Sequence, residues 1–203
     1  GDKTLNPLFT LSMNNKTLAP VCLYTRKGEV KDVAQLKGKK WGGICPLATR
    51  YILYKNGFDM PIDKFFSQIN YIPDMPITNV TDPLLAGKID VFTAYESVVW
   101  ISGALNKKNA GFEPAFCEVF DHTWVFAARK TFDPALAEQM KKIMLNAHKD
   151  KDFAQFKFAF QMVNGRFVPI EKADMAKISA IAALAEKKGW KREEQAFFKK
   201  YSK

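Results

Sequence analysis

The chain lacks several features that would assign it to a common functional class. No apolar run approaches the roughly 20 residues that a helix needs to cross a bilayer. No G-x-S-x-G elbow, H-E-x-x-H, phosphate-binding G-x-x-x-x-G-K-[ST] or G-x-G-x-x-G is present. Only two histidines occur, and His122 follows Asp121, although adjacent residues on a strand face opposite ways. These absences argue against a membrane-embedded protein and against an enzyme, and they predict no catalytic residue.

Cysteines are also few. Cys22, Cys45 and Cys117 form no C-x-x-C pair and have no histidine at ligand spacing, so the sequence predicts no metal and no cofactor. Cys22 and Cys117 lie in apolar or aromatic segments, where cysteine usually behaves as a small buried hydrophobe. An oxidising compartment would allow a disulfide, but the sequence favours buried free thiols.

Charge of one sign is in excess. There are 31 Lys and Arg residues against 21 Asp and Glu residues, a net charge of +10. The densest basic group, 187–192, is followed at once by Glu193 and Glu194, and the other basic residues are dispersed. Nucleic-acid binders concentrate such residues on one face, so we expect a solvated surface and no nucleic-acid partner. Weak steering of anionic ligands remains an alternative.

The chain has 203 residues, of which 47% are hydrophobic, enough for one good core or two small lobes. Between Leu18 and Leu105, segments typical of strands and helices alternate. The expected strands are Leu18–Thr25, Lys40–Ile44, Ile69–Pro73 and Ile89–Thr93. Helices are expected at 32–36, 49–56, 78–86 and 97–105. This alternation predicts an α/β fold with a mainly parallel sheet and helices on both faces.

The two ends of the chain differ from this middle part. Residues 1–15 show no strong period, so no strand is expected there. Two further strands are expected at 116–120 and 123–128, and apolar stripes predict a helical last third. We therefore expect three segments: an extension or first-lobe remnant at 1–18, an α/β ligand-binding lobe at 19–130, and helices at 131–203.

Polar residues follow three of the expected strands. Ligands of α/β sheets bind beyond the carboxyl ends of strands, where helix N-termini also favour anions. The candidate ligand-binding residues are Ala48, Thr49, Arg50, Thr78, Asn79, Tyr95 and Glu96.

Each candidate also has a structural interpretation. Thr49 could be an N-cap and Arg50 a solvated residue on the helix surface. Thr78 and Asn79 could likewise cap a helix. Tyr95 could pack at the sheet edge, while Glu96 begins the next helix.

Two phrases and their order carry a family resemblance. They are Asp32-Val-Ala-Gln-Leu-Lys-Gly-Lys39, ahead of the loop at 48–50, and Leu85-Ala-Gly-Lys-Ile-Asp-Val-Phe92. From Leu18 to Asn146 the chain resembles the second lobe of type II periplasmic solute-binding proteins of the phosphonate-binding and NMT1-like group. The resemblance implies binding without chemical conversion, a periplasmic location and the membrane subunits of an ABC transporter as partners. The family's loop has consecutive hydroxyl residues and often a histidine in the next loop, whereas this chain offers only Thr49. Phosphonate, another oxyanion and a carboxylate therefore all remain open.

The expected function is the solute-binding component of a bacterial ABC importer with a small anionic ligand. One alternative is a periplasmic sensor module of a signalling receptor. Another is a LysR-type effector domain, which should open with a first-lobe strand that Gly1–Thr10 does not resemble.

Overall fold

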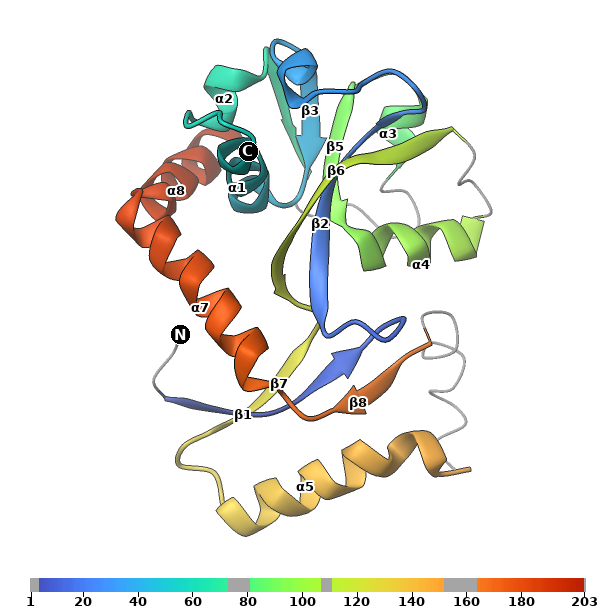
Figure 1. The fold of residues 1–203 in the computed structure, drawn as a ribbon, viewed down its shortest axis with the longest axis vertical. Coiled ribbons are helices and arrows are strands. Elements are labelled where there is room, and N and C mark those ends of the chain that lie inside the picture. The colour runs from blue at the N-terminus through green and yellow to red at the C-terminus, as the bar shows by residue number, and fades with distance from the viewer. Residues whose placement is uncertain (1–3, 73–80, 107–110, 152–163, 203) are drawn as a thin grey trace. The chain divides into compact units, whose positions relative to one another are not determined.

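The computed structural model describes residues 4–72, 81–106, 111–151 and 164–202 (Figure 1). The chain forms two compact units, each built from segments distant in sequence. Unit 1 comprises Gly1–Ala19 and Asp121–Ile181, and unit 2 comprises Pro20–Phe120 and Ala182–Lys203. The expected segments 1–18, 19–130 and 131–203 are each continuous in sequence, whereas each unit consists of two separate stretches of the chain. The chain begins in unit 1, forms most of unit 2, returns to unit 1 and ends in unit 2.

Unit 1 has a three-stranded sheet in the order β7-β1-β8. Its elements are β1 (Leu5–Ser12), β7 (Val125–Arg129), α5 (Pro134–Asn146), η3 (Ala147–Lys149) and β8 (Arg166–Val168). β1 is central and pairs antiparallel with both neighbours. The Asp133 carboxylate accepts hydrogen bonds from the N–H groups of Ala135 and Leu136, so α5 begins where the sequence predicts.

β1 corrects the expectation that residues 1–15 contain no strand. Its last four residues are all buried, and they include Thr10 and Ser12. The Thr10 hydroxyl donates to the Trp124 carbonyl at 2.8 Å, which satisfies one of these buried polar groups. Since polar residues occupy buried positions, the alternation that marks a half-buried strand is missing from the sequence.

Unit 2 has a five-stranded sheet in the order β4-β3-β5-β2-β6. Its strands are β2 (Leu18–Arg26), β3 (Lys40–Gly43), β4 (Gln68–Tyr71), β5 (Val91–Tyr95) and β6 (Phe112–His122). Its helices are η1 (Val33–Leu36), α1 (Pro46–Lys55), α2 (Ile62–Phe65), α3 (Asp82–Leu85), α4 (Glu96–Asn106) and α8 (Trp190–Tyr201). α7 (Lys172–Lys187) runs across the boundary between the units.

The fold is mixed α/β, and the mainly parallel sheet is not confirmed. β3 is parallel to β4 and β5, but β2 is antiparallel to β5, and the sheet of unit 1 is antiparallel. Strands β3, β4 and β5 are joined by segments that contain helices, which permit parallel pairing. β2 enters from unit 1 without such a crossover, so its direction is not fixed by the strand–helix alternation.

Apolar side chains cover both faces of the five-stranded sheet. Along β2, Val21 and Leu23 belong to one cluster, whereas Cys22 and Tyr24 belong to the other, as the period of a strand requires. α1 and α8 pack on the first face, and α3 and α4 on the second (Figure 1). No helix among the residues that the structure describes is long and apolar enough to cross a membrane.

A disulfide corrects the expectation of free thiols. Cys22 of β2 and Cys117 of β6 are bonded, and they lie on neighbouring strands although 95 residues separate them in sequence. Cys45 is free. Sequence alone could not reveal the pair, because only the folded sheet places β2 beside β6.

Candidate functional site

The carboxyl ends of β3 and β5 meet at one edge of the five-stranded sheet. These strands are parallel, with Gly43 opposite Thr93. α1 follows β3 and α4 follows β5 directly, so residues 48–50 and Tyr95–Glu96 lie near the same edge. Residues 48–50 were expected in a loop, but they lie inside α1, which begins at Pro46. Thr78 and Asn79, the third part of the expected site, lie outside the described residues.

Two glycines allow the close packing below this edge. A Cβ atom on Gly42 would lie 2.6 Å from Ile89 Cδ1, and one on Gly43 would lie 2.7 Å from the Thr93 carbonyl oxygen. Gly43 also has a φ of +154°, which other residues rarely adopt. Glycine is thus required at positions 42 and 43, because Ile89 and the backbone of β5 leave no room for a side chain there.

Thr49 joins α1 to β5. Its hydroxyl lies 2.9 Å from the Cys45 carbonyl oxygen and 2.9 Å from the Thr93 hydroxyl, and the Trp41 indole N–H donates to Thr93 at 2.8 Å. Thr49 is fully buried, and the N-cap position of α1 is Cys45. Thr49 therefore links α1 to β5 beneath the surface of this edge. It is neither the N-cap of α1 nor a hydroxyl donor exposed to solvent. Ala48 is buried beside it.

Arg50 is an internal residue, which corrects its interpretation as a solvated helix-surface side chain. It is 5% exposed. Its Nη2 lies 2.6 Å from Asp59 Oδ1, its Nε lies 3.0 Å from Glu193 Oε2, and its Nη1 donates to the Phe58 carbonyl. The guanidinium also stacks 4.9 Å from the centre of the Trp190 ring. Its charge is paired within the protein, and this pairing accounts for its position.

Tyr95 and Glu96 are half-buried at the end of β5. Tyr95 packs against the apolar cluster that includes Trp41 and Val91, and Glu96 opens the first turn of α4. Burial, followed by the negative charge of Glu96, raises the pKa of the Tyr24 hydroxyl. Tyr95 and Glu96 are the two predicted site residues in the described part that keep partial exposure.

The first turn of α1 receives a carboxylate from the C-terminal helix. Cys45 makes no side-chain cap, and Pro46 has no N–H group, so Leu47 provides the first free helical donor. The Glu194 carboxylate accepts a hydrogen bond from the Leu47 backbone N–H. Burial raises the pKa of the Glu194 carboxyl, and the Leu47 N–H opposes that shift.

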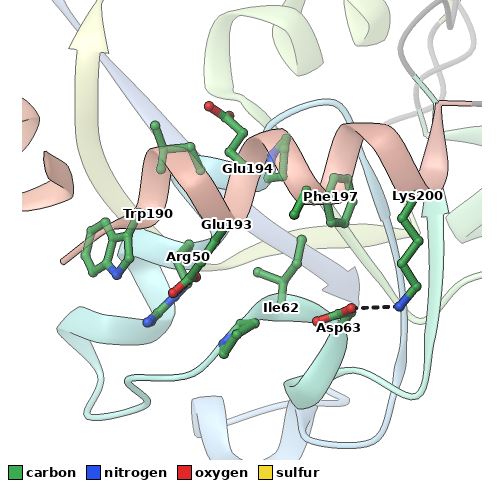
Figure 2. Close-up of a pocket in the computed structure, with 12 residues that line it drawn as sticks. Arg50, Ile62, Asp63, Trp190, Glu193, Glu194, Phe197 and Lys200 are labelled. Atoms are coloured by element: carbon green, nitrogen blue, oxygen red, sulfur yellow. Dashed lines mark hydrogen bonds and ion pairs between the residues drawn. The ribbon is translucent and has the colours of Figure 1, made fainter.

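A cavity of about 220 Å³ lies in unit 2 among α1, α2 and α8 (Figure 2). Apolar side chains and prolines make up most of its lining, with charged groups among them. The charged residues of the lining are Arg50, Asp63, Glu193, Glu194 and Lys200. Figure 2 shows Glu193 beside Arg50 and Lys200 beside Asp63, whereas Glu194 points away from these two pairs. No three His, Cys, Asp or Glu side chains in the described parts of the chain could together hold a metal ion.

Sequence reasoning missed the contribution of α8. The sequence predicts that Glu193 and Glu194 balance the basic residues 187–192 on a solvated surface, yet both glutamates line the cavity. The signal was present: Trp190, Phe197 and Tyr201 recur at helical spacing, and all three contact rings of unit 2.

No family model matches the chain, and no curated protein matches it. Solved structures do match. The chain is similar to XAC2383 from Xanthomonas citri, solved with chloride, at 15% identity and a TM-score of 0.66, covering 91% of this chain and 71% of that one. It is similar to PhnD1 from Prochlorococcus marinus in complex with methylphosphonate, at 17% identity and a TM-score of 0.65, covering 90% and 72%. It is also similar to the periplasmic aliphatic sulphonate binding protein SsuA from Escherichia coli, at 9% identity and a TM-score of 0.58, covering 92% and 69%. The chain thus has the type II periplasmic binding protein fold.

Proposed function

We propose that this chain is the solute-binding component of a bacterial ABC importer and binds a small anionic solute without converting it. The observation that carries the proposal is the meeting of two helix N-termini, those of α1 and α4, at one edge of a sheet with this fold. Each helix N-terminus carries a partial positive charge that favours an anion. Ligands of open α/β sheets bind at such an edge.

The named ligands of similar structures support an anion. XAC2383 has been solved with chloride and with ATP, PhnD1 with methylphosphonate, and SsuA is named for aliphatic sulphonates. In this chain Thr49 is buried and bonded within the protein, so a row of hydroxyl donors for three phosphonate oxygens is not the basis of recognition. A carboxylate or another oxyanion therefore fits the proposal as well as a phosphonate does.

Tyr95 and Glu96 are the proposed ligand contacts from β5 and α4, with Thr78 and Asn79 expected beside them. A tyrosine hydroxyl can donate to an anion, and a carboxylate accepts from a hydroxyl or amino group. The proposed solute therefore carries an anionic group together with a hydroxyl or amine. Ala48, Thr49 and Arg50 form the buried support of this site.

The disulfide supports an extracytoplasmic location. Disulfides persist in the periplasm and are rare in the cytosol, where a LysR-type regulator works. β1 supplies the N-terminal strand that such a regulator should have, so the Cys22–Cys117 disulfide is the feature that disfavours this alternative.

Ligand capture tests the proposal. Small molecules retained through native purification are identified by mass spectrometry, and calorimetric titration compares phosphonates, sulphonates, carboxylates and their neutral analogues. Tyr95→Phe removes one hydroxyl, so we expect affinity to fall roughly 2- to 10-fold. Tyr54→Phe, an equal change on α1, should leave affinity unchanged. Binding of neutral analogues as tight as that of anions, or equal affinity of Tyr95→Phe and the native protein, would contradict the proposal.

A further inference from the structure

The cavity among α1, α2 and α8 has the size and lining of a second binding site. Its volume of about 220 Å³ admits a small organic molecule. Apolar contacts come from all three helices, through Leu47, Ile62 and Phe197. These residues belong to unit 2, and the cavity shares the first turn of α1, through Pro46 and Leu47, with the sheet edge proposed for the anionic solute.

The charges around the cavity are unevenly paired. Two cations line it, and each has an anionic partner: Arg50 is bonded to Glu193 at 3.0 Å, and Lys200 to Asp63 at 2.9 Å. The third lining carboxylate, Glu194, accepts the Leu47 N–H and points away from both pairs (Figure 2). Three carboxylates against two cations leave the lining with one excess negative charge, in a chain whose net charge is +10.

Glu194 is a half-buried carboxylate. Burial disfavours its charged form, and one backbone N–H offsets this only in part. A carboxylate has two oxygens with about four acceptor positions, so a donor placed in the cavity can bond to it without displacing Leu47. A cationic donor there would stabilise the carboxylate and pair the excess charge.

We infer that this cavity binds a small molecule with an apolar body and a protonated amine, with the amine hydrogen-bonded to Glu194. The apolar body contacts Leu47, Ile62 and Phe197. An anionic molecule of the same shape is disfavoured by the excess negative charge of the lining. Affinity for the amine rises with pH as Glu194 loses its proton.

Titration with three probes of one shape tests the inference: 2-phenylethylamine, neutral 2-phenylethanol and anionic phenylacetate. A charge-assisted hydrogen bond is stronger than a neutral one, so the amine should bind about 3- to 30-fold more tightly than the alcohol, and phenylacetate least. Glu194→Gln should remove this preference and its pH dependence while leaving the alcohol unaffected. Glu186→Gln makes the same charge change on an exposed residue that is absent from the lining and should change nothing.

A second variant keeps the test decisive if Glu194→Gln does not fold. Ala196 lines the cavity and is exposed, so Ala196→Phe should fill the space, remove binding of amine and alcohol alike, and leave anion binding at the sheet edge intact. Equal affinity for amine and alcohol would overturn the inference, as would unchanged amine binding in Glu194→Gln or Ala196→Phe. Loss of anion binding with retained amine binding would reject the proposed function and leave this site standing.

Discussion

Arg50 and Asp59 form an ion pair in which Nη2 lies 2.6 Å from Oδ1, and only the arginine is buried, with 6% of its side chain exposed against 44% for Asp59. Glu193 of α8 bonds to the other side of the same guanidinium. Arg50 therefore connects α1, the loop after it and the C-terminal helix.

Replacing Arg50 should destabilise the fold. Arg50→Ala leaves two carboxylates without their common partner and removes the stacking on Trp190. Breaking a buried pair costs about 3–5 kcal/mol, and the partial exposure of Asp59 and Glu193 lowers our expectation to about 2–4 kcal/mol. Urea unfolding followed by circular dichroism measures the loss. Lys191→Ala breaks the exposed pair with Glu186 and should change the free energy of unfolding little; a loss as small for Arg50→Ala would contradict the assigned role.

Asp59 should make stability fall in acid. Hydrogen bonds from Lys188, and then from Arg50, hold the pKa of Asp59 below its ordinary value of 3.8. A carboxyl whose pKa is lower in the folded state stabilises the fold above its unfolded pKa, and this contribution is lost as pH falls through the folded pKa. We expect Asp59→Asn to be less stable than the native protein near neutral pH and to converge with it as the pH falls through the lowered pKa of Asp59.

Thermal melts across that range measure the convergence. Glu138→Gln changes an exposed carboxylate that lies 3.9 Å from the Lys141 ammonium, and it should follow the native protein throughout. If the difference between Asp59→Asn and the native protein stays constant with pH, Asp59 does not contribute through its charge.

The Cys22–Cys117 disulfide should be a major source of stability in unit 2. It closes a loop across 95 residues of sequence, and removing such a bond from a small domain costs about 2–5 kcal/mol. The double variant Cys22→Ala, Cys117→Ala should melt at a lower temperature and no longer respond to reducing agent. Cys45→Ser should keep the native response, because the disulfide joins Cys22 and Cys117 and not Cys45. Equal melting of native protein with and without reductant would show that the bond contributes nothing.

Gly43 should be less replaceable than other glycines with positive φ. Gly43→Ala places a Cβ 2.7 Å from the Thr93 carbonyl, whereas at Gly57, with φ +88°, a Cβ meets nothing within 4 Å. We expect Gly57→Ala to cost about 1 kcal/mol through the backbone alone and Gly43→Ala clearly more, because β3 and β5 must move apart. Similar losses in unfolding free energy would mean that the strands are not packed as described.

Local elements were predictable because their signals lie within a few residues. Asp32 caps η1 in a capping box with Gln35, and Gly38 follows with a φ of +78°. The start of α1 was placed three residues late, since Thr49 resembles a cap but bonds to Thr93 instead. In both cases a polar side chain stands where a helix could begin, and the partner of that side chain decides whether the helix begins there.

The parts that failed depend on contacts between distant residues. Arg50 and Glu193 are separated by 143 residues, and the bond from Leu47 to Glu194 spans a similar length. Nothing near Arg50 in sequence indicates that α8 covers it. The carboxyl edge itself was predictable, because parallel neighbours place their following loops together whatever packs around them.

Hydrogen exchange of the protein with and without its captured anionic solute tests the central claim most directly. Binding at the sheet edge should slow exchange of backbone amides at 43–49 and 93–98, which include the first turns of α1 and α4, and should leave β1, β7 and β8 unchanged. A solute that binds tightly while protecting neither segment would contradict the proposed site.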